Sequence, residues 1–415
     1  MTEFAAAAEQ AAAALAAVME PTPLQRNAFL SERYGADIWL KREDLSPVRS
    51  YKLRGAFTFL SMALQRNPEQ ARFVCASAGN HAQGFAWACR HFGRHGTVFM
   101  PVTTPEQKIM KTRVFGGEFV EVVLTGDFFD ASLKAAQEHA AANEAVFVPP
   151  FDADDTILGQ ATVAVEILAA LPEPDLVMLP VGGGGLAAGV TKYFAAKGAS
   201  AGFRFVEPET AASLYEALNA GHPVTLPKVS SFVDGAAVAR IGERPFAALH
   251  GASPAQVIRV AEGHLCRTMV EMLNVEGVVL EPAGALSIDA LADLPPDVLR
   301  GRTVVCVVSG GNFDFERLPE VKERAMRHEG RKKYFILRLP QRPGALKDFL
   351  GLLGPDDDIA RFEYLKKSAR NFGSILLGIE TKDPAGFPGL YARMEENGIV
   401  YEDITGNDTL MSLIV

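Results

Sequence analysis

Short apolar runs alternate with longer amphipathic segments through residues 72–148. Four of the runs have the length and burial pattern of strands, at 72–76, 97–100, 119–124 and 146–148. Helical spacing of apolar residues follows the first three runs, up to residue 92, after Pro101 and over 130–142. Strands that are joined by helices in this way run parallel, so the pattern predicts βα units around a parallel sheet.

The same alternation continues on both sides of this region. Strands are expected at 35–40, 175–181, 204–208 and 303–308, and the last of these is the most apolar. We expect helices at 5–19, 55–66, from about 158 to 171, from 185 to 196, at 209–218, near 254–274 and after Glu281. The chain up to residue 320 is therefore predicted to be an α/β domain built on parallel strands.

The tail has a different pattern. Charged residues crowd 316–333, which predicts a helix and then a linker at 321–333. Beyond it we expect strand 334–339, helix 345–353, strands 359–366 and 373–380, helix 385–397, and strands near 399–404 and 410–415. This βαββαβ order predicts an α+β, ferredoxin-like domain over 334–415. It carries no obvious catalytic set, which favours ligand sensing or assembly.

Composition narrows the class of protein. A chain of 415 residues is long enough for two or three domains, and 48% hydrophobic with 22% charged residues is typical of a soluble globular protein. The net charge of −9 argues against a nucleic-acid partner. No apolar run reaches the roughly 18 residues of a membrane helix, and the Ala-rich start lacks a basic signal-peptide region. Four cysteines without metal-ligand spacing fit a reducing cytosol.

Lys52 is the first candidate for chemistry. It stands in Ser50-Tyr51-Lys52-Leu53-Arg54-Gly55, after an expected strand and a charged loop. Alone, a lysine in a loop is usually solvated. A role in binding pyridoxal phosphate as a Schiff base requires a phosphate cradle, a partner for the ring nitrogen and a site for a substrate carboxylate.

Three other segments stand where an expected strand ends, and they supply these needs. Gly182 to Gly185, followed by Leu186, separate a strand from a helix, and free N–H groups at a helix N-terminus favour a phosphate. Ser77-Ala78-Gly79-Asn80-His81 opens another helix in the same manner, although a tight structural turn would have the same composition. Ser309-Gly310-Gly311-Asn312 follows the strand at 303–308, at the edge where open α/β sheets bind ligands.

Together these motifs resemble the fold-type II pyridoxal phosphate enzymes, which share the tryptophan synthase β-like fold, and within them the threonine dehydratases (threonine ammonia-lyases). The resemblance implies that residues 1–320 form two lobes, with a small lobe of about 55–160 inserted in a large lobe. The resemblance implies that Lys52 is catalytic and that Tyr51, Asn80, Gly182, Gly183, Gly184, Gly185, Leu186 and Ser309 contact the cofactor. It implies that Ser77, Ala78, Gly79, Asn80 and His81 bind the substrate carboxylate. The tail, with Pro340-Gln341-Arg342-Pro343-Gly344, is similar to the single ACT-like regulatory domain of the short biosynthetic members.

The chain departs from the family pattern at three places. Tyr51 stands where phenylalanine is commoner, and Ala161 stands where glycine is usual. In related serine racemases a glutamate, a backbone carbonyl and an aspartate hold a divalent cation. Glu207 and Ala211 match the first two positions, but Ser213 replaces the aspartate, so we expect no firm metal site.

The implied activity is β-elimination of L-threonine, with L-serine as a secondary substrate, to 2-oxobutanoate and ammonia. This is the first step of isoleucine biosynthesis. Because Ser309 is neutral, it would not keep the cofactor's ring nitrogen protonated, which favours elimination over transamination. The resemblance further implies inhibition by isoleucine through the tail, opposition by valine, a cytoplasmic location and a homotetramer, with a dimer as the alternative.

Two other readings remain open at this point. A serine dehydratase or serine racemase of the same fold would share the motifs, although the tail argues against both. A non-catalytic amino-acid sensor would keep the fold but would not need Lys52, Asn80 and Ser309 together.

Overall fold

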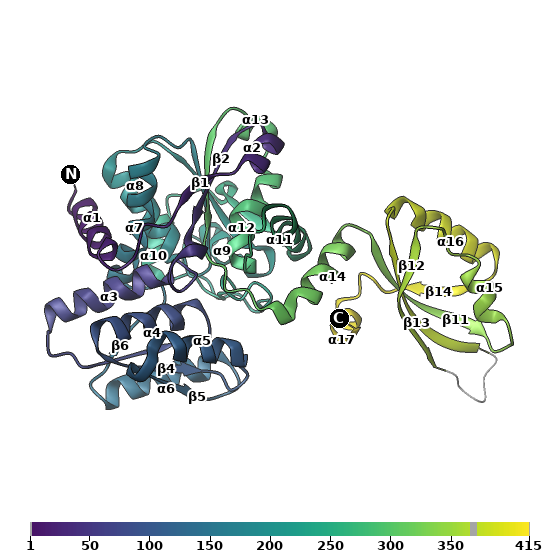
Figure 1. Cartoon of the computed structure of the whole chain (residues 1–415), viewed down its shortest axis with the longest axis horizontal. Helices are drawn as coiled ribbons and strands as arrows, with labels where there is room; N and C mark the ends of the chain where they lie inside the picture. Colours follow the sequence, from purple (N-terminus) through teal and green to yellow (C-terminus); the bar gives the residue numbers. More distant parts are fainter. Residues whose placement is uncertain (1, 366–371, 415) are drawn as a thin grey trace. The chain divides into compact units, whose positions relative to one another are not determined.

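The computed structural model describes residues 2–365 and 372–414. The chain forms two compact units, Met1–Asp314 and Phe315–Val415. Figure 1 shows the first unit in purple to green and the second in light green to yellow. In the part of the chain that is described, no helix has the length and apolar character needed to cross a bilayer.

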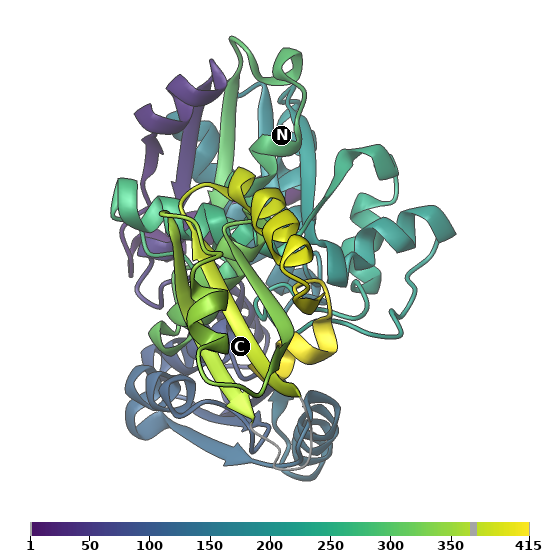
Figure 2. The same cartoon turned by 90° about the vertical axis from the view of Figure 1, so that its right-hand side faces the viewer.

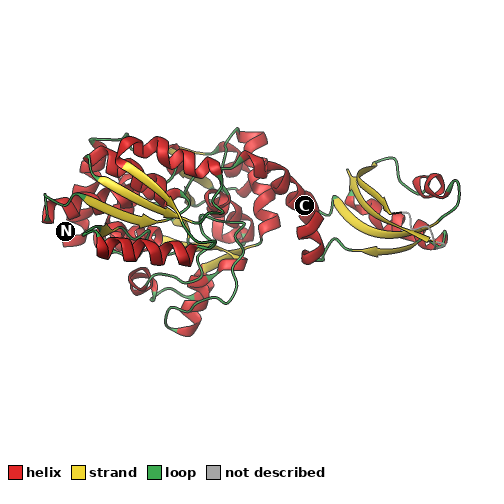
Figure 3. Ribbon diagram, turned by 90° about the horizontal axis from the view of Figure 1, so that it is seen from below, coloured by secondary structure: helices red, strands yellow, loops and turns green. Residues whose placement is uncertain are grey.

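The first unit contains a large mixed sheet of six strands in the order β1-β2-β10-β7-β8-β9. All neighbouring pairs are parallel except β1 with β2. The strands are β1 Leu24–Arg26, β2 Asp37–Arg42, β7 Leu176–Pro180, β8 Gly202–Pro208, β9 Val257–Val260 and β10 Thr303–Val308. Every residue of β7 is buried, because helices cover both faces of the sheet (Figure 3).

A second, smaller sheet has the order β5-β4-β3-β6 and is parallel throughout. Its strands are β3 Arg72–Ala76, β4 His95–Met100, β5 Val120–Leu124 and β6 Val146–Phe147. In Figure 2 this sheet, in blue, is separate from the strands of the large sheet. The α/β fold with two sheets is thus confirmed, and the small sheet falls within the segment predicted as an inserted lobe.

Helices of the first unit complete both cores. They are α1 Glu3–Ala16, α2 Ala28–Tyr34, α3 Lys52–Arg66, α4 Asn80–Phe92, α5 Glu106–Gly116, α6 Phe129–Ala142, α7 Asp154–Ala170, α8 Gly185–Lys197, α9 Ser213–Ala220, α10 Glu243–Leu249, α11 Glu262–Glu276, α12 Pro282–Asp289 and α13 Pro296–Leu299. Helices α1, α7, α8, α9 and α10 pack on one face of the large sheet, and α12 packs on the other. Helices α3, α4 and α5 cover one face of the small sheet, and α6 covers the other.

A buried network of charges fixes the start of α3. Arg54 is fully buried, and its guanidinium donates to Glu43 (2.7 Å from Nε to Oε2) and to Glu166 (2.7 Å from Nη1 to Oε1). Lys41 also pairs with Glu166 and donates to the backbone oxygen of Thr22 at 2.6 Å. Burial disfavours the charged form of Arg54, but Glu43 and Glu166 outweigh this effect and raise its pKa above the usual value. The network joins β2, α3 and α7, and its central residue, Arg54, is two residues after Lys52 in the chain.

The second unit is a four-stranded antiparallel sheet in the order β12-β13-β11-β14. Its elements are α14 Leu318–His328, β11 Lys332–Pro340, α15 Ala345–Leu350, β12 Asp357–Leu365, β13 Phe372–Thr381, α16 Phe387–Glu396, β14 Val400–Asp403 and α17 Asp408–Ile414. Helices α15 and α16 pack on one face through Phe349 and Leu390, and α17 packs on the other through Met411 (Figure 1). The predicted ferredoxin-like unit is confirmed.

Several details of the structure differ from the sequence prediction. The segment near 254–274 is not one helix, because β9 precedes α11 and pairs with β8. The segment 410–415 was expected to be a strand, but residues up to Ile414 form α17, whose Met411 packs against Tyr334 and Ile404. Short strand β1 and helix α2 were not predicted. The end of the strand predicted at 359–366 lies outside the described residues. Helix α14 occupies most of the segment that was predicted to be the linker.

Candidate active site

The residues before Lys52 lie beside the segment that follows β10. Tyr51 N donates to the Ser309 backbone oxygen at 3.1 Å, and Ser50 pairs with Gly310 in an isolated antiparallel bridge. Gly311 N donates to the Arg49 backbone oxygen at 2.9 Å. Two motifs far apart in sequence are therefore held in register by backbone hydrogen bonds. This register places Lys52 at the carboxyl edge of the large sheet.

Lys52 is the first residue of α3, and its amine lies among aromatic and backbone groups. Nζ donates to the Pro150 backbone oxygen at 2.9 Å, and it lies 5.2 Å from the ring centroid of Tyr51 and 5.9 Å from that of Phe151. Burial lowers the pKa of Lys52 to about 8, although Glu281 opposes the shift. An amine with this pKa is substantially neutral near pH 8, which is the state required of a nucleophile or base.

The loop Ser77–Gly79 leads into the N-terminus of α4, which starts at Asn80. Gly79 N donates to Ser77 Oγ at 3.2 Å, and no heavy atom lies within 4 Å of the position that a Cβ of Gly79 would occupy. Ala78 is half-buried between them. The first N–H groups of a helix lack intrahelical acceptors, so this N-terminus offers donors next to open space. A carboxylate fits such a site.

Gly84 explains why this loop reaches Lys52. A Cβ at Gly84 would lie 2.8 Å from the Leu53 backbone nitrogen and 2.9 Å from the Lys52 backbone carbon. The absence of a side chain lets α4 pass directly against the first turn of α3. The loop and the lysine are therefore neighbours because of a glycine one turn into α4.

His81 is buried and neutral. Its Nε2 lies 3.0 Å from the Val148 backbone oxygen, which can only accept, so Nε2 carries the proton and Nδ1 does not. Burial, and then the charge of Lys52, lower the pKa of His81 to about 3. Nδ1 is buried without a hydrogen-bond partner. His81 can thus accept one hydrogen bond but carries no charge at neutral pH.

Asn80 is held by two side chains from the large lobe. Its Nδ2 donates to Glu281 Oε1 at 2.6 Å, and its Oδ1 accepts from Asn312 Nδ2 at 2.8 Å. Burial, assisted by Asp234, raises the pKa of Glu281 to about 7. A Cβ at Gly310 would lie 2.1 Å from Glu281 Oε1, so a side chain at this position would displace the carboxyl group that holds Asn80.

Ser309 is buried at the end of β10, and its hydroxyl donates to the Ala283 backbone oxygen at 3.1 Å. A hydroxyl rotates freely about its C–O bond, so Ser309 can give up this acceptor for another. Since its partner is an uncharged carbonyl, Ser309 can offer a ligand a neutral hydroxyl as donor or acceptor.

The glycines at 182–185 form the turn between β7 and α8, and buried Leu186 lies in the first turn of α8. Gly184 has φ of +87°, a conformation that favours glycine. A Cβ at Gly183 would lie 2.2 Å from the ring of Phe151, and one at Gly182 would lie 2.9 Å from Ala236 Cα. Protein packing thus accounts for these glycines in part, which the sequence did not predict.

The expected weak metal positions have other partners. Glu207 is buried, and its carboxylate accepts from the backbone N–H groups of Leu214 (2.8 Å) and Tyr215 (3.0 Å) in the first turn of α9. Burial raises the pKa of Glu207 to about 8 despite these bonds. Ala211 is buried, and the Ser213 hydroxyl lies 3.5 Å from the Gly182 backbone oxygen. No group of three or more His, Cys, Asp or Glu side chains suited to a metal ion occurs within residues 2–365 and 372–414.

Several residues at the site were not predicted. Pro150 and Phe151 contact Lys52, Glu281 holds Asn80, and Lys108 on α5 forms an ion pair with Asp234 from the large lobe. Only Glu281 had a visible signal in the sequence, because it is a single carboxylate inside the apolar run 278–286. Pro150, Phe151 and Asp234 come from loops with no pattern of their own, and Lys108 is one of several charged residues on α5.

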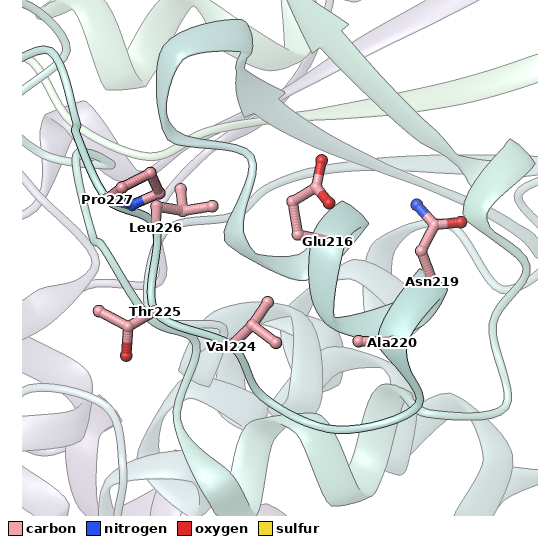
Figure 4. Close-up of a pocket in the computed structure, with 7 residues that line it drawn as sticks. All are labelled: Glu216, Asn219, Ala220, Val224, Thr225, Leu226 and Pro227. Carbon is pink, nitrogen blue, oxygen red and sulfur yellow. The ribbon is translucent and has the colours of Figure 1, made fainter.

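A hollow of about 610 Å³ lies elsewhere in the large lobe, between α9 and the loop that follows it (Figure 4). Its lining residues are Glu216, Asn219, Ala220, Val224, Thr225, Leu226 and Pro227. None of the predicted site residues lines it, so it is not the site described above.

Comparison with known proteins agrees with this geometry. Residues 15–310 match the family described as pyridoxal-phosphate dependent enzyme, and residues 323–414 match the C-terminal regulatory domain of threonine dehydratase. The biosynthetic L-threonine dehydratase of Bacillus subtilis is 48% identical over 396 residues, which are 95% of this chain and 93% of the relative. The Mycobacterium tuberculosis protein of the same name is 49% identical over 397 residues, 95% of this chain and 92% of the relative.

Comparison with solved structures identifies the same fold. The processed form of threonine deaminase isoform 2 from Solanum lycopersicum is 34% identical with a TM-score of 0.71, covering 78% of this chain and 94% of that one. Maize serine racemase is 25% identical with a TM-score of 0.70, covering 78% and 98%. The fold is therefore that of fold-type II pyridoxal phosphate enzymes, as expected. On these matches over both units, the chain belongs to the threonine dehydratases, pyridoxal-phosphate-dependent enzymes with a C-terminal regulatory domain.

Proposed function

We propose that this chain converts L-threonine to 2-oxobutanoate and ammonia, with L-serine as a secondary substrate, as the first step of isoleucine biosynthesis. Threonine loses its Cα proton and its β-hydroxyl as water, and the released enamine takes up water and gives off ammonia. The observation that carries the proposal is the convergence of three groups: Lys52, whose pKa is lowered to about 8, the neutral Ser309 at the same edge of the large sheet, and the open N-terminus of α4, which packs against the first turn of α3. The threonine dehydratases of Bacillus subtilis and Mycobacterium tuberculosis support the choice of substrate.

Lys52 would attach the cofactor and then act as the base that removes the Cα proton. The bound pyridoxal phosphate would stabilise the negative charge that develops at Cα. The low pKa of Lys52, about 8, supports the basic role, because a permanently protonated amine could not accept a proton. The Pro150 oxygen, 2.9 Å away, would hold the amine in place once it is free.

The other contacts follow the predicted assignment. Ser309 would donate to the ring nitrogen, and Asn80 would donate to the cofactor's 3′-oxygen. Tyr51 would contact the cofactor ring, and the turn Gly182 to Gly185 with Leu186 would bind its phosphate through N–H groups at the start of α8. Donors at the start of α4, from Ser77, Ala78, Gly79, Asn80 and His81, would bind the substrate carboxylate.

Neutral Ser309 favours elimination over transamination. An acidic partner would keep the ring nitrogen protonated and spread negative charge into the ring, whereas a hydroxyl does so weakly. Charge retained at Cα promotes departure of the neighbouring β-hydroxyl. The contact of the Ser309 hydroxyl with the uncharged Ala283 carbonyl supports this assignment.

The C-terminal unit is the proposed regulatory site. Isoleucine would bind it and lower activity, and valine would oppose isoleucine; a coupling free energy of roughly 1–3 kcal/mol suffices for such a response. The match of residues 323–414 to a regulatory domain supports the role, while the choice of effectors rests on the family resemblance. We also propose that the enzyme is cytoplasmic and that it is a homotetramer. Light scattering on the purified protein would test the oligomeric state.

The deciding experiment is an assay of the purified protein for 2-oxobutanoate from L-threonine, with and without isoleucine and valine. We expect turnover, slower turnover of L-serine, and inhibition by isoleucine that valine relieves. Formation of D-serine from L-serine without 2-oxo acid would instead identify a racemase. A colourless protein that turns over neither substrate when pyridoxal phosphate is supplied would contradict the proposal.

A further inference from the structure

Asn312, which has no role in the proposed function, is the centre of a chain of hydrogen bonds that includes Asn80. Its Nδ2 donates to the Val48 backbone oxygen at 2.8 Å and to Asn80 Oδ1, also at 2.8 Å. Its Oδ1 lies 3.4 Å from Lys111 Nζ on α5. Asn80 continues the chain to Glu281.

Two independent groups determine which way the Asn312 amide points. A backbone carbonyl only accepts hydrogen bonds, so Val48 requires the NH₂ end of the amide. A lysine amine that is charged only donates, so Lys111 requires the oxygen end. Both requirements agree, and a flipped amide would lose both contacts. The orientation is thus determined by chemistry rather than by atom assignment alone.

The orientation of Asn312 fixes that of Asn80. One N–H of Asn312 is taken by Val48, and the other points at Asn80, which must present its oxygen. The NH₂ end of Asn80 is then directed away from Asn312, where one hydrogen is taken by Glu281. An NH₂ group has two hydrogens, so one donor remains for a ligand.

We propose that Asn312 is a positioning residue that makes Asn80 present an N–H, not its oxygen, to the cofactor. This inference rests on the proposed contact between Asn80 and the cofactor's 3′-oxygen. A donated hydrogen bond stabilises the ionised form of that oxygen, whereas an amide oxygen in the same place would repel it. Asn312 thereby influences the electronic state of the cofactor without touching it.

The variant Asn312→Asp tests the proposal, because it has the same shape but lacks both N–H donors. Apo protein is titrated with pyridoxal phosphate by fluorescence, and the visible absorbance of the loaded protein is followed against pH. We expect the dissociation constant to rise about tenfold, and the pH midpoint of the absorbance change to rise by about one unit. Asn80→Asp should shift the midpoint in the same direction, and the double variant should shift it less than the sum.

Asn67→Asp, on an exposed turn, is the matched control and should behave as wild type. Asn312→Ser supplies a neutral second variant in case the added carboxylate prevents folding. It keeps one donor, so we expect a smaller shift in the same direction. A purely structural role for Asn312 would lower the unfolding temperature and leave the midpoint in place, and that result would overturn the proposal.

The outcome separates the inference from the function on which it rests. If wild-type protein shows a Lys52-dependent absorbance band and both Asn312 variants leave its pH midpoint unchanged, only the positioning role fails. If wild-type protein binds no pyridoxal phosphate, the proposed contact of Asn80 fails, and the positioning role fails with it.

Discussion

The amine of Lys52 lies 2.9 Å from the backbone oxygen of Pro150, 98 residues further along the chain. A backbone carbonyl accepts a hydrogen bond from a neutral amine as well as from a charged one, and it adds no negative charge to raise the pKa. A carboxylate at this place would keep the amine protonated. The pair Lys52 and Pro150 therefore combines a fixed position with a pKa near 8.

Replacing Lys52 by alanine removes the amine that we propose attaches the cofactor and accepts the Cα proton. We expect kcat for L-threonine to fall by at least about 10³, in the range seen when a general base is removed, together with loss of the visible band of the loaded enzyme. Lys134→Ala is the matched control, because its side chain is 78% exposed on α6. Retained turnover in Lys52→Ala would show that the base is another group.

Arg54→Ala tests whether the buried charges stabilise the start of α3. The substitution would leave Glu43 buried without its principal partner, and removal of one member of a buried pair costs about 3–5 kcal/mol in free energy of unfolding. Urea unfolding of the apo protein measures this loss. Arg66→Ala, which removes an ion pair of an arginine that is 59% exposed on the same helix, should cost less than about 1 kcal/mol. Equal losses in the two variants would contradict a special role for the buried network.

The sequence predicted elements best where the pattern is local. Strand β10 is an unbroken apolar run because both faces of the sheet are covered, and its limits were predicted correctly. Strand β9 is only four residues long and precedes a helix, so its pairing with β8 leaves little mark on periodicity. Helix α17 was missed because its apolar residues also suit a strand, and its state depends on packing against Tyr334.

The same distinction between local and non-local patterns applies to the residues of the site. Lys52, Asn80 and Ser309 lie at the ends of elements where the sequence pattern directs attention. Glu281 and Pro150 matter because the fold brings them next to residues 201 and 98 positions away, and no local pattern encodes such distances. The glycine turn was predicted, but only the structure shows that Phe151 also requires its glycines.

Gly84→Ala tests the close approach of α4 to α3. The added Cβ would lie within 3 Å of the Leu53 and Lys52 backbones, which cannot move aside as a flexible side chain can. We expect a loss of about 1–3 kcal/mol in free energy of unfolding and a rise in KM, because the Ser77–Gly79 loop would shift away from Lys52. Gly251→Ala is the control, since no heavy atom lies within 4 Å of its added Cβ. An unchanged KM in a destabilised Gly84→Ala enzyme would mean that the approach serves stability only.

The raised pKa of Glu207 has a consequence for stability against pH. A carboxyl group whose pKa is about 8 when folded and about 4.5 when unfolded stabilises the protein fully below pH 4.5, and this contribution is lost as pH rises through 8. The free energy of unfolding of Glu207→Gln should therefore rise relative to that of wild type between pH 5.5 and 8. The difference should grow by up to roughly 1.4 kcal/mol per pH unit, as measured by urea unfolding. Glu209→Gln, at an exposed position, is the control, and its free energy of unfolding should change with pH in the same way as that of wild type. A parallel curve for Glu207→Gln would show that Glu207 is ionised in the fold, as a cation ligand would be.

Removal of the tail separates catalysis from regulation. The break between the two compact units lies after Asp314, so a chain ending there keeps all the residues proposed to bind cofactor and substrate. We expect this shortened enzyme to bind pyridoxal phosphate with its visible band, and to turn over L-threonine with kcat within about threefold of the full chain at rates insensitive to isoleucine and valine. The reason is that an effector shifts activity only through a site it can bind, and the matched regulatory region, 323–414, is absent.

Calorimetry with isoleucine should give heat with the full chain and none with the shortened one. If the shortened enzyme is still inhibited by isoleucine, the effector acts at the catalytic unit, and the regulatory role assigned to the tail is wrong.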